Sequence, residues 1–135
     1  MNPGSVFFDE EFAFHDGQSG EKLFLVLGSD REIAVVAKTT SRQHGRGNTF
    51  GCQTDRFYNF FLPPQSCYLR KPTWVCLDEF YEVRLAAALS KSLRSIIKPV
   101  CTIEHSLLRL IQECAKGSLD ITDQQHDLVH ACLAT

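Results

Sequence analysis

A strand–turn–strand pattern over residues 20–41, GEKLFLVLGSDREIAVVAKTTS, constrains the fold more than any other part of the chain. Residues 23–27 and 33–37 are almost continuously apolar, and a polar turn at residues 28–32 separates them. Apolar runs rich in β-branched residues and bounded by Gly and Asp are typical of two strands joined by a turn. Because neither run alternates polar with apolar residues, both faces of each strand are expected to be buried. The pattern predicts a hairpin at the centre of a small closed antiparallel barrel.

Further strands are expected on both sides of this hairpin. The patterns predict strands at residues 5–8 and 57–62 and one long strand at residues 73–83. Residues 12–20 and 41–51 are rich in Gly and polar residues and are expected to be loops, the second one mobile and exposed.

The pattern changes after residue 84. Helix formers there predict a short helix, and residues 95–100 predict an edge strand at most because they contain Pro99. Thr102 is expected to cap a helix, and Gly117 is well placed to end that helix at its C′ position. A capping box of Thr122 and Gln125 predicts the start of a last helix.

Strands followed by helices indicate an α+β protein whose core is a small antiparallel barrel. With 135 residues, the chain is expected to form a single domain over residues 1–135. We expect the barrel core over about residues 4–83 and a helical C-terminal extension over about residues 84–135.

Charge and hydropathy limit the partners of the chain. Its formal net charge is −2 at pH 7, so no overall basic field would draw it onto nucleic acid. Contact with RNA or DNA therefore has to come from a local patch. No apolar run approaches the roughly 20 residues of a membrane helix, and no membrane partner is expected.

Cysteine usage favours a reducing compartment. The first residues lack the basic and apolar segments of a signal peptide, so we expect a cytoplasmic protein with reduced thiols. The six cysteines include no CxxC pair, which argues against a zinc ribbon and a thioredoxin-type motif. We expect no metal and no cofactor, and we expect most of the thiols, Cys52 included, to be buried and structural.

The polar end of the hairpin carries the main candidate site. Lys38 is followed by Thr39, Thr40 and Ser41, and three hydroxyls beside a cation suit a phosphate or a developing oxyanion. The alternative is a strand end whose hydroxyls hold backbone groups.

Cations near the strand ends extend this candidate site. Together with Phe50 and Phe57, they would form a basic, aromatic pocket for single-stranded nucleic acid if the strand ends converge. These cations are Lys22, Lys38, Arg42, Arg46, Arg70 and Lys71. The alternative is an ordinary solvated surface.

Histidines are the candidates for proton transfer. His44 lies in the glycine-rich loop, and His15 could also reach a pocket at the strand ends. His126 and His130 lie four residues apart, and two ligands do not make a zinc site, so they are expected on a partly exposed helix face.

The order of these motifs resembles the MazF/PemK-like toxin superfamily over about residues 4–83. The matching segments are Gly4-Ser5-Val6-Phe7, Gly20-Glu21-Lys22, Leu25-Val26-Leu27 and Lys38-Thr39-Thr40-Ser41. The resemblance implies an SH3-like barrel, often dimeric, that cuts single-stranded RNA without a metal and is silenced by an antitoxin. By position, Lys22 takes the place of the family's Arg, which handles protons and phosphate charge. Thr39 takes the place of its Thr, with Thr40 adjacent.

The sequence therefore predicts a toxin-type endoribonuclease. The expected catalytic residues are Lys22, Thr39, Thr40 and His44, and the expected RNA-binding residues are Lys38, Ser41, Arg42 and Arg46. The expected partners are single-stranded RNA, an antitoxin or other protein, and a second copy of the chain. The alternative is a catalytically inactive barrel that serves as a protein-binding module.

Overall fold

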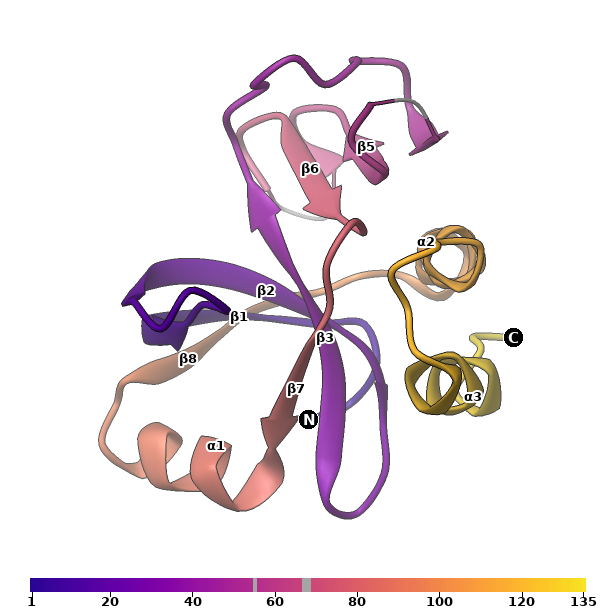
Figure 1. Cartoon of the computed structure of the whole chain (residues 1–135). Helices are drawn as coiled ribbons and strands as arrows, with labels where there is room; N and C mark the ends of the chain where they lie inside the picture. The colour runs from indigo at the N-terminus through magenta and orange to yellow at the C-terminus, as the bar shows by residue number, and fades with distance from the viewer. Residues whose placement is uncertain (55, 67–68) are drawn as a thin grey trace.

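A computed structural model of the chain describes residues 1–54, 56–66 and 69–135 (Figure 1). Within them the elements in chain order are β1 (Ser5–Ala13), β2 (Ser19–Ser29), β3 (Ile33–Thr40), β4 (Gly51–Gln53), β5 (Asn59–Leu62), β6 (Thr73–Cys76), β7 (Tyr81–Arg84), α1 (Leu85–Leu93), β8 (Ile97–Thr102), α2 (His105–Lys116) and α3 (Asp123–Ala131). The predicted α+β class is confirmed, with an antiparallel sheet and helices in the C-terminal part of the chain.

The central hairpin is formed by β2 and β3, as the sequence predicts. The two strands pair antiparallel, with Phe24 opposite Lys38 and Val26 opposite Val36. Their apolar runs are at most 1% exposed from Phe24 to Leu27 and from Ala34 to Ala37, so both faces of the hairpin are covered. The turn is shorter than expected, because the Asp30 carboxylate accepts hydrogen bonds from the backbone amides of residues 32 and 33.

β3 lies in the middle of the sheet and pairs with other strands along both of its edges. One edge of β3 pairs with β2, whereas its other edge pairs first with β7, over residues 33–36, and then with β6, at Thr39 and Thr40. The order is β4-β5-β6-β3-β2-β1-β8, with β7 also on β3. Within the described residues β4 and β8 each pair on one side only, so the sheet is not closed into the predicted barrel.

β1 is longer than the expected strand at residues 5–8. It continues through the acidic run to Ala13, with an irregularity in its pairing to β2 between Asp9 and Phe12. Asp9 is only 3% exposed, and its carboxylate accepts a hydrogen bond from the Lys91 ammonium. The expected loop at residues 12–20 is therefore reduced to a turn between β1 and β2.

The long strand predicted at residues 73–83 is wrong, because two strands occupy it. β6 ends at Cys76 and β7 begins at Tyr81, and the two strands pair with different parts of β3. Between them the backbone turns aside at Leu77, whose amide donates to the Tyr58 carbonyl and whose carbonyl accepts from the Ser118 hydroxyl. β5 confirms the strand predicted within residues 57–62.

The helices follow their predicted positions with changes at the ends. α1 forms where expected, and β8 lies at the edge of the sheet against β1. α2 is capped by Glu104, since Thr102 is still part of β8. α2 ends at Gly117, as the sequence predicts, and this residue has a right-handed conformation. The capping box of Thr122 and Gln125 is confirmed at α3.

α2 and α3 lie side by side against the sheet and close one side of the main core (Figure 1). Leu108 and Ile111 of α2 and Val129 of α3 are at most 2% exposed in that core. α3 crosses β2 at Gly28, where an added Cβ atom would lie 3.0 Å from the Leu128 carbonyl oxygen. No helix in the described residues is long and apolar enough to span a membrane.

The cysteines differ from the expectation of reduced thiols. Cys52 of β4 and Cys114 of α2 form a disulfide with a Cα–Cα distance of 5.6 Å. Cys52 is also exposed rather than buried, whereas Cys76 is buried as predicted. Cys67 lies outside the described residues. Pairing of two residues 62 positions apart depends on tertiary structure, which the local sequence does not encode.

Candidate functional site

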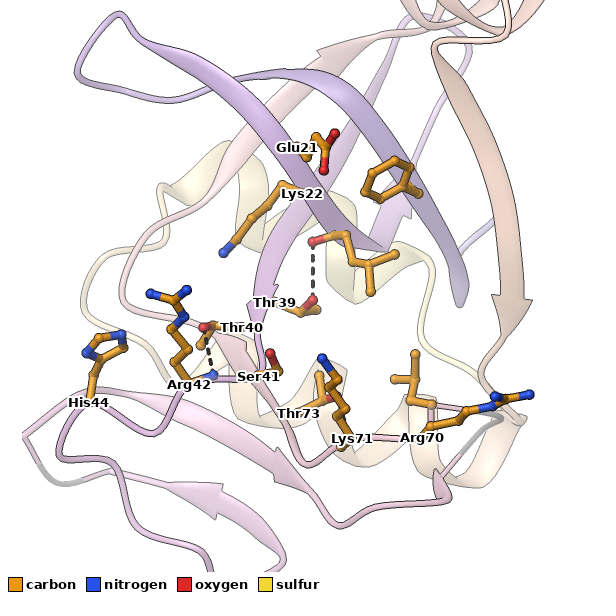
Figure 2. A pocket seen from close by; sticks show the side chains of 13 residues that line it. Glu21, Lys22, Thr39, Thr40, Ser41, Arg42, His44, Arg70, Lys71 and Thr73 are labelled. Carbon is orange, nitrogen blue, oxygen red and sulfur yellow. Dashed lines mark hydrogen bonds between the residues drawn. The ribbon is translucent and has the colours of Figure 1, made fainter.

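A cleft of about 790 Å³ opens where β2 and β3 separate at the polar end of the hairpin (Figure 2). The ladder between the two strands ends at the pair Phe24–Lys38. Beyond this pair, the Thr39 hydroxyl donates to the Leu23 carbonyl at 3.2 Å, and the strands diverge. The residues that line the cleft are Phe8, Glu21, Lys22, Leu23, Thr39, Thr40, Ser41, Arg42, His44, Leu69, Arg70, Lys71 and Thr73.

All four expected catalytic residues lie around this one cleft. Lys22 comes from β2, Thr39 and Thr40 come from the end of β3, and His44 comes from the following loop. Of the expected RNA-binding residues, Ser41 and Arg42 also line it. The strand ends therefore converge as the sequence predicts.

Two expected RNA-binding residues do not line the cleft. Lys38 forms an ion pair with Glu79 and lies over the Phe14 ring. Burial acts to lower the pKa of Lys38, but the hydrogen bond and charge of Glu79 outweigh it and hold that pKa above its usual value. Arg46 stacks its guanidinium over the Phe57 ring and points toward the Cys76 sulfur.

Lys22 is the central cation of the cleft. It is partly buried, and this burial lowers the pKa of its ammonium group. The nearby charges of Lys38, Arg46 and Arg42 lower that pKa further, although Cys76 acts in the opposite direction. An ammonium surrounded by other cations gains most from a bound anion, since the anion relieves this repulsion.

The hydroxyls at the end of β3 hold backbone groups, as the alternative interpretation predicts. Thr39 is buried and bonds to the Leu23 carbonyl, which fixes the chain next to Lys22. The Thr40 hydroxyl accepts from the Arg42 amide at 3.2 Å and shapes the start of the loop. Ser41 is exposed at the cleft. Thr39 and Thr40 thus act mainly by positioning their cationic neighbours.

The loop of residues 41–50, here called the cleft loop, is largely exposed, as expected, and hydrogen bonds anchor it at Gly47. The Gly47 carbonyl accepts from the Trp74 indole at 2.7 Å and from the Gln53 amide at 3.0 Å. His44 and Gly45 have positive φ angles of 45° and 80°, which turn the chain sharply. The loop therefore carries Arg42 and His44 on the stretch between the end of β3 and this anchor.

The opposite wall comes from the segment before β6. Lys71 points its ammonium into the cleft, and Arg70 points away from it (Figure 2). These two residues belong to the basic group that the sequence singles out. The sequence interpretation missed Phe8, Glu21, Leu69 and Thr73. The alternation of β2 places Glu21 and Lys22 on opposite faces, so only the opening of the strands explains why both reach the cleft.

The cleft is locally basic on a chain with a net charge of −2. Among the described residues its lining contains the four cations Lys22, Arg42, Arg70 and Lys71 and the single carboxylate of Glu21. Within low-dielectric walls such a group attracts anions. The lining also contains a carboxylate, Glu21, and an imidazole, His44, the side-chain types that most often serve in general acid–base catalysis.

His15 and Phe50, which the sequence also suggests for the pocket, lie outside the cleft lining. His15 stacks on Tyr81, and its Nε2 atom lies 2.8 Å from the Phe80 carbonyl, so it does not line the cleft. Phe50 packs against Phe60, away from the cleft lining.

His126 and His130 share one face of α3, with ring centroids 6.3 Å apart. Both are at least partly accessible to solvent, as expected. In the described part of the chain, no group of three His, Cys, Asp or Glu residues is arranged to hold a metal ion.

The chain matches no model of a known protein family and no curated protein sequence. The geometry and charge of the cleft are therefore the basis for assigning a function.

Proposed function

We propose that the cleft binds the phosphodiester backbone of single-stranded RNA and cleaves it without a metal ion. The observation that carries this proposal is the convergence of Lys22, Arg42 and Lys71 on one cleft at the end of the hairpin. Cations contact phosphates without regard to sequence, and they do so most strongly where they are partly desolvated. The volume of about 790 Å³ suits a ligand larger than inorganic phosphate.

The resemblance to the MazF/PemK-like superfamily supports the same assignment. Lys22 and Thr39, which occupy the family's Arg and Thr positions, line one cleft although they lie on different strands. The sheet is open where that family has an SH3-like barrel, so the likeness depends on the hairpin and its polar end. Lys22 offers a point charge rather than the bidentate fork of an arginine, and Arg42 beside it supplies a guanidinium.

The proposed reaction uses the RNA's own 2′-hydroxyl as the nucleophile. A base removes the 2′ proton, the 2′ oxygen attacks the adjacent phosphorus, and the bond from phosphorus to the 5′ oxygen breaks. An acid protonates the departing 5′ oxygen, which leaves a 2′,3′-cyclic phosphate and a 5′-hydroxyl. We assign the base to Glu21 and the acid to His44, since both line the cleft and a carboxylate can take up a proton that an imidazole can supply.

Lys22 and Arg42 would stabilise the charge that develops on the phosphate oxygens. Their ammonium and guanidinium groups lie close enough to repel each other in the free protein. Thr39 acts through the backbone, because its bond to the Leu23 carbonyl fixes the residue next to Lys22. Thr39 is therefore a positioning residue in this mechanism.

The test uses a fluorescent single-stranded RNA in EDTA. Cleavage is followed by gel electrophoresis, and affinity is followed by anisotropy with an analogue that carries 2′-deoxyriboses and cannot be cut by this reaction. Lys22→Ala should lower the cleavage rate by about 100-fold, the effect of removing one preorganised charge from a transition state. Lys98→Ala is the matched control, because Lys98 is an exposed lysine on β8 outside the cleft.

Equal cleavage by the wild type and Lys22→Ala would refute this site. Binding of the analogue without cleavage of the RNA would refute the catalytic half of the proposal and leave an RNA-binding cleft. Absence of both binding and cleavage would refute the whole proposal.

A further inference from the structure

β4 is a short edge strand with few contacts of its own. It has three residues and pairs only with β5 among the described strands, from Gly51–Phe61 to Gln53–Asn59. The disulfide from Cys52 to Cys114 is its covalent link to α2. A three-residue edge ladder gives little stability, so this link determines how firmly β4 is held.

β4 in turn supports the cleft loop. The Gln53 side-chain amide donates both to the Gly47 carbonyl at 3.0 Å and to the Asn59 side chain at 2.7 Å. The cleft loop enters β4 directly after Phe50, which packs edge-on against Phe60. Movement of β4 would remove the Gln53 bond and leave the Gly47 carbonyl to the Trp74 indole alone, so the backbone that presents Arg42 and His44 to the cleft would be held less firmly.

α2 does not depend on the disulfide for its position. Its apolar face is buried in the main core, and the Gln112 side chain donates to the Leu27 carbonyl of β2 at 2.9 Å. The Tyr58 hydroxyl also donates to the Cys114 carbonyl at 2.7 Å. Opening the disulfide would therefore loosen β4 while α2 stays in place.

We propose that the Cys52–Cys114 disulfide is a redox switch that controls the affinity of the cleft for RNA through β4 and the cleft loop. This inference rests on the proposed function. Cys52 is the exposed partner and Cys114 is 5% exposed, so a reductant reaches the bond from the Cys52 side. Accessible disulfides are generally the ones that cells reduce and re-form.

The reductant is a thiol of the glutathione or dithiol class. Its thiolate attacks the Cys52 sulfur, the S–S bond breaks, and Cys114 leaves as a thiolate that takes up a proton. A second thiolate then attacks the reductant's sulfur in the mixed disulfide and releases Cys52. Two electrons enter the protein, which gains two thiols, and the reductant becomes a disulfide.

The experiment compares the oxidised full-length protein with the same protein reduced by dithiothreitol. Affinity for the uncleavable RNA analogue is measured by anisotropy, and hydrogen–deuterium exchange is measured over residues 41–53 and over α2. We expect about tenfold weaker binding after reduction, which corresponds to the loss of one charge-assisted contact. Exchange should accelerate over residues 41–53 and stay constant in α2.

Cysteine variants identify the thiols involved. Cys52→Ser should bind RNA as weakly as the reduced wild type and should not respond to dithiothreitol. Cys132→Ser is the matched control, since Cys132 lies at the end of α3 outside the cleft, and it should keep the full response.

The proposal is overturned if reduction changes neither exchange nor affinity, if exchange changes without affinity, or if Cys52→Ser still responds. It is also overturned if mass spectrometry finds no Cys52–Cys114 bond in the oxidised protein. If neither form binds the analogue, the proposed function fails, and control of RNA affinity fails with it. The exchange data then still decide whether the disulfide holds the cleft loop.

Discussion

Gln112 is the side chain that joins the helices to the central hairpin. It lies on α2, is fully buried, and donates from Nε2 to the Leu27 carbonyl at 2.9 Å. The pairing of β2 with β3 changes register between Val26 and Gly28, so Leu27 is the extra residue of a bulge. The backbone of an extra residue is left unpaired in the ladder, and Gln112 satisfies this carbonyl.

The loss of stability expected on replacing Gln112 follows from the three hydrogen bonds of its side chain. Besides the Leu27 carbonyl, Gln112 binds the Cys132 carbonyl and the Ala134 amide, each at 2.9 Å. Gln112→Leu would keep most of the volume and remove all three bonds. The Leu27 carbonyl has no access to water, which costs about 1–3 kcal/mol. The two terminal bonds can be replaced by water and add about 0.5–1.5 kcal/mol each.

We therefore expect Gln112→Leu to lower the free energy of unfolding by about 2–6 kcal/mol. Urea denaturation followed by circular dichroism measures this difference. Gln124→Leu is the matched control, because Gln124 is exposed on α3 and should change stability by less than about 0.5 kcal/mol. Equal stability of the two variants would refute the role of Gln112 at the bulge.

Three further predictions concern individual contacts. Gly28→Ala should destabilise the fold by about 1–3 kcal/mol, since its Cβ would press on the Leu128 backbone, and an unchanged melting temperature would contradict this contact. Lys91→Met leaves the buried Asp9 carboxylate without its ammonium partner. Because the Lys91 side chain is 28% exposed, we expect the free energy of unfolding to fall by about 1–3 kcal/mol, which is less than the full effect of breaking a buried pair. A loss of stability no larger than that caused by Lys98→Met, which removes the pair with the exposed Glu10, would contradict this role of Lys91. The lowered pKa of Lys22 means that its ammonium loses its proton at a lower pH than an ordinary lysine, so RNA affinity should fall as pH rises toward that range. Lys22→Arg should keep its affinity to higher pH, and coincident pH profiles would show that Lys22 does not carry the charge that binds RNA.

The hairpin could be predicted because its determinants are local. Two continuous apolar runs around a polar turn specify the pairing of β2 with β3, and the pairing brings Lys22 near Thr39. The capping box of α3 is equally local, since Thr122 and Gln125 are three residues apart. Both features depend on neighbouring residues alone, so the residue pattern is enough to predict them.

Other features depend on partners far along the chain. The acidic run of β1 lies beyond the strand expected at residues 5–8, and Asp9 is buried there because Lys91, 82 residues later, neutralises it. The break between β6 and β7 has a similar origin, since each strand pairs with a different stretch of β3. An uninterrupted apolar pattern does not show where one strand changes its partner.

Part of the candidate site could be predicted because it depends on the hairpin, whose determinants are local. Lys22 and the residues after β3 meet because the hairpin brings its ends together. Glu21 and Thr73 line the cleft only because β2 opens away from β3 and the segment before β6 crosses beneath it. That opening is a property of the bent sheet and has no counterpart in the residue pattern.

We propose that the cleft holds an RNA phosphodiester. The most direct test of this proposal is a ¹H–¹⁵N NMR titration of the protein with the uncleavable single-stranded analogue. We expect the largest amide shift changes at residues 21–23, 39–44 and 70–73, and we expect these changes to be lost in Lys22→Ala. Saturation with no shifts in these three segments, or with shifts centred on α1 and β7, would contradict it.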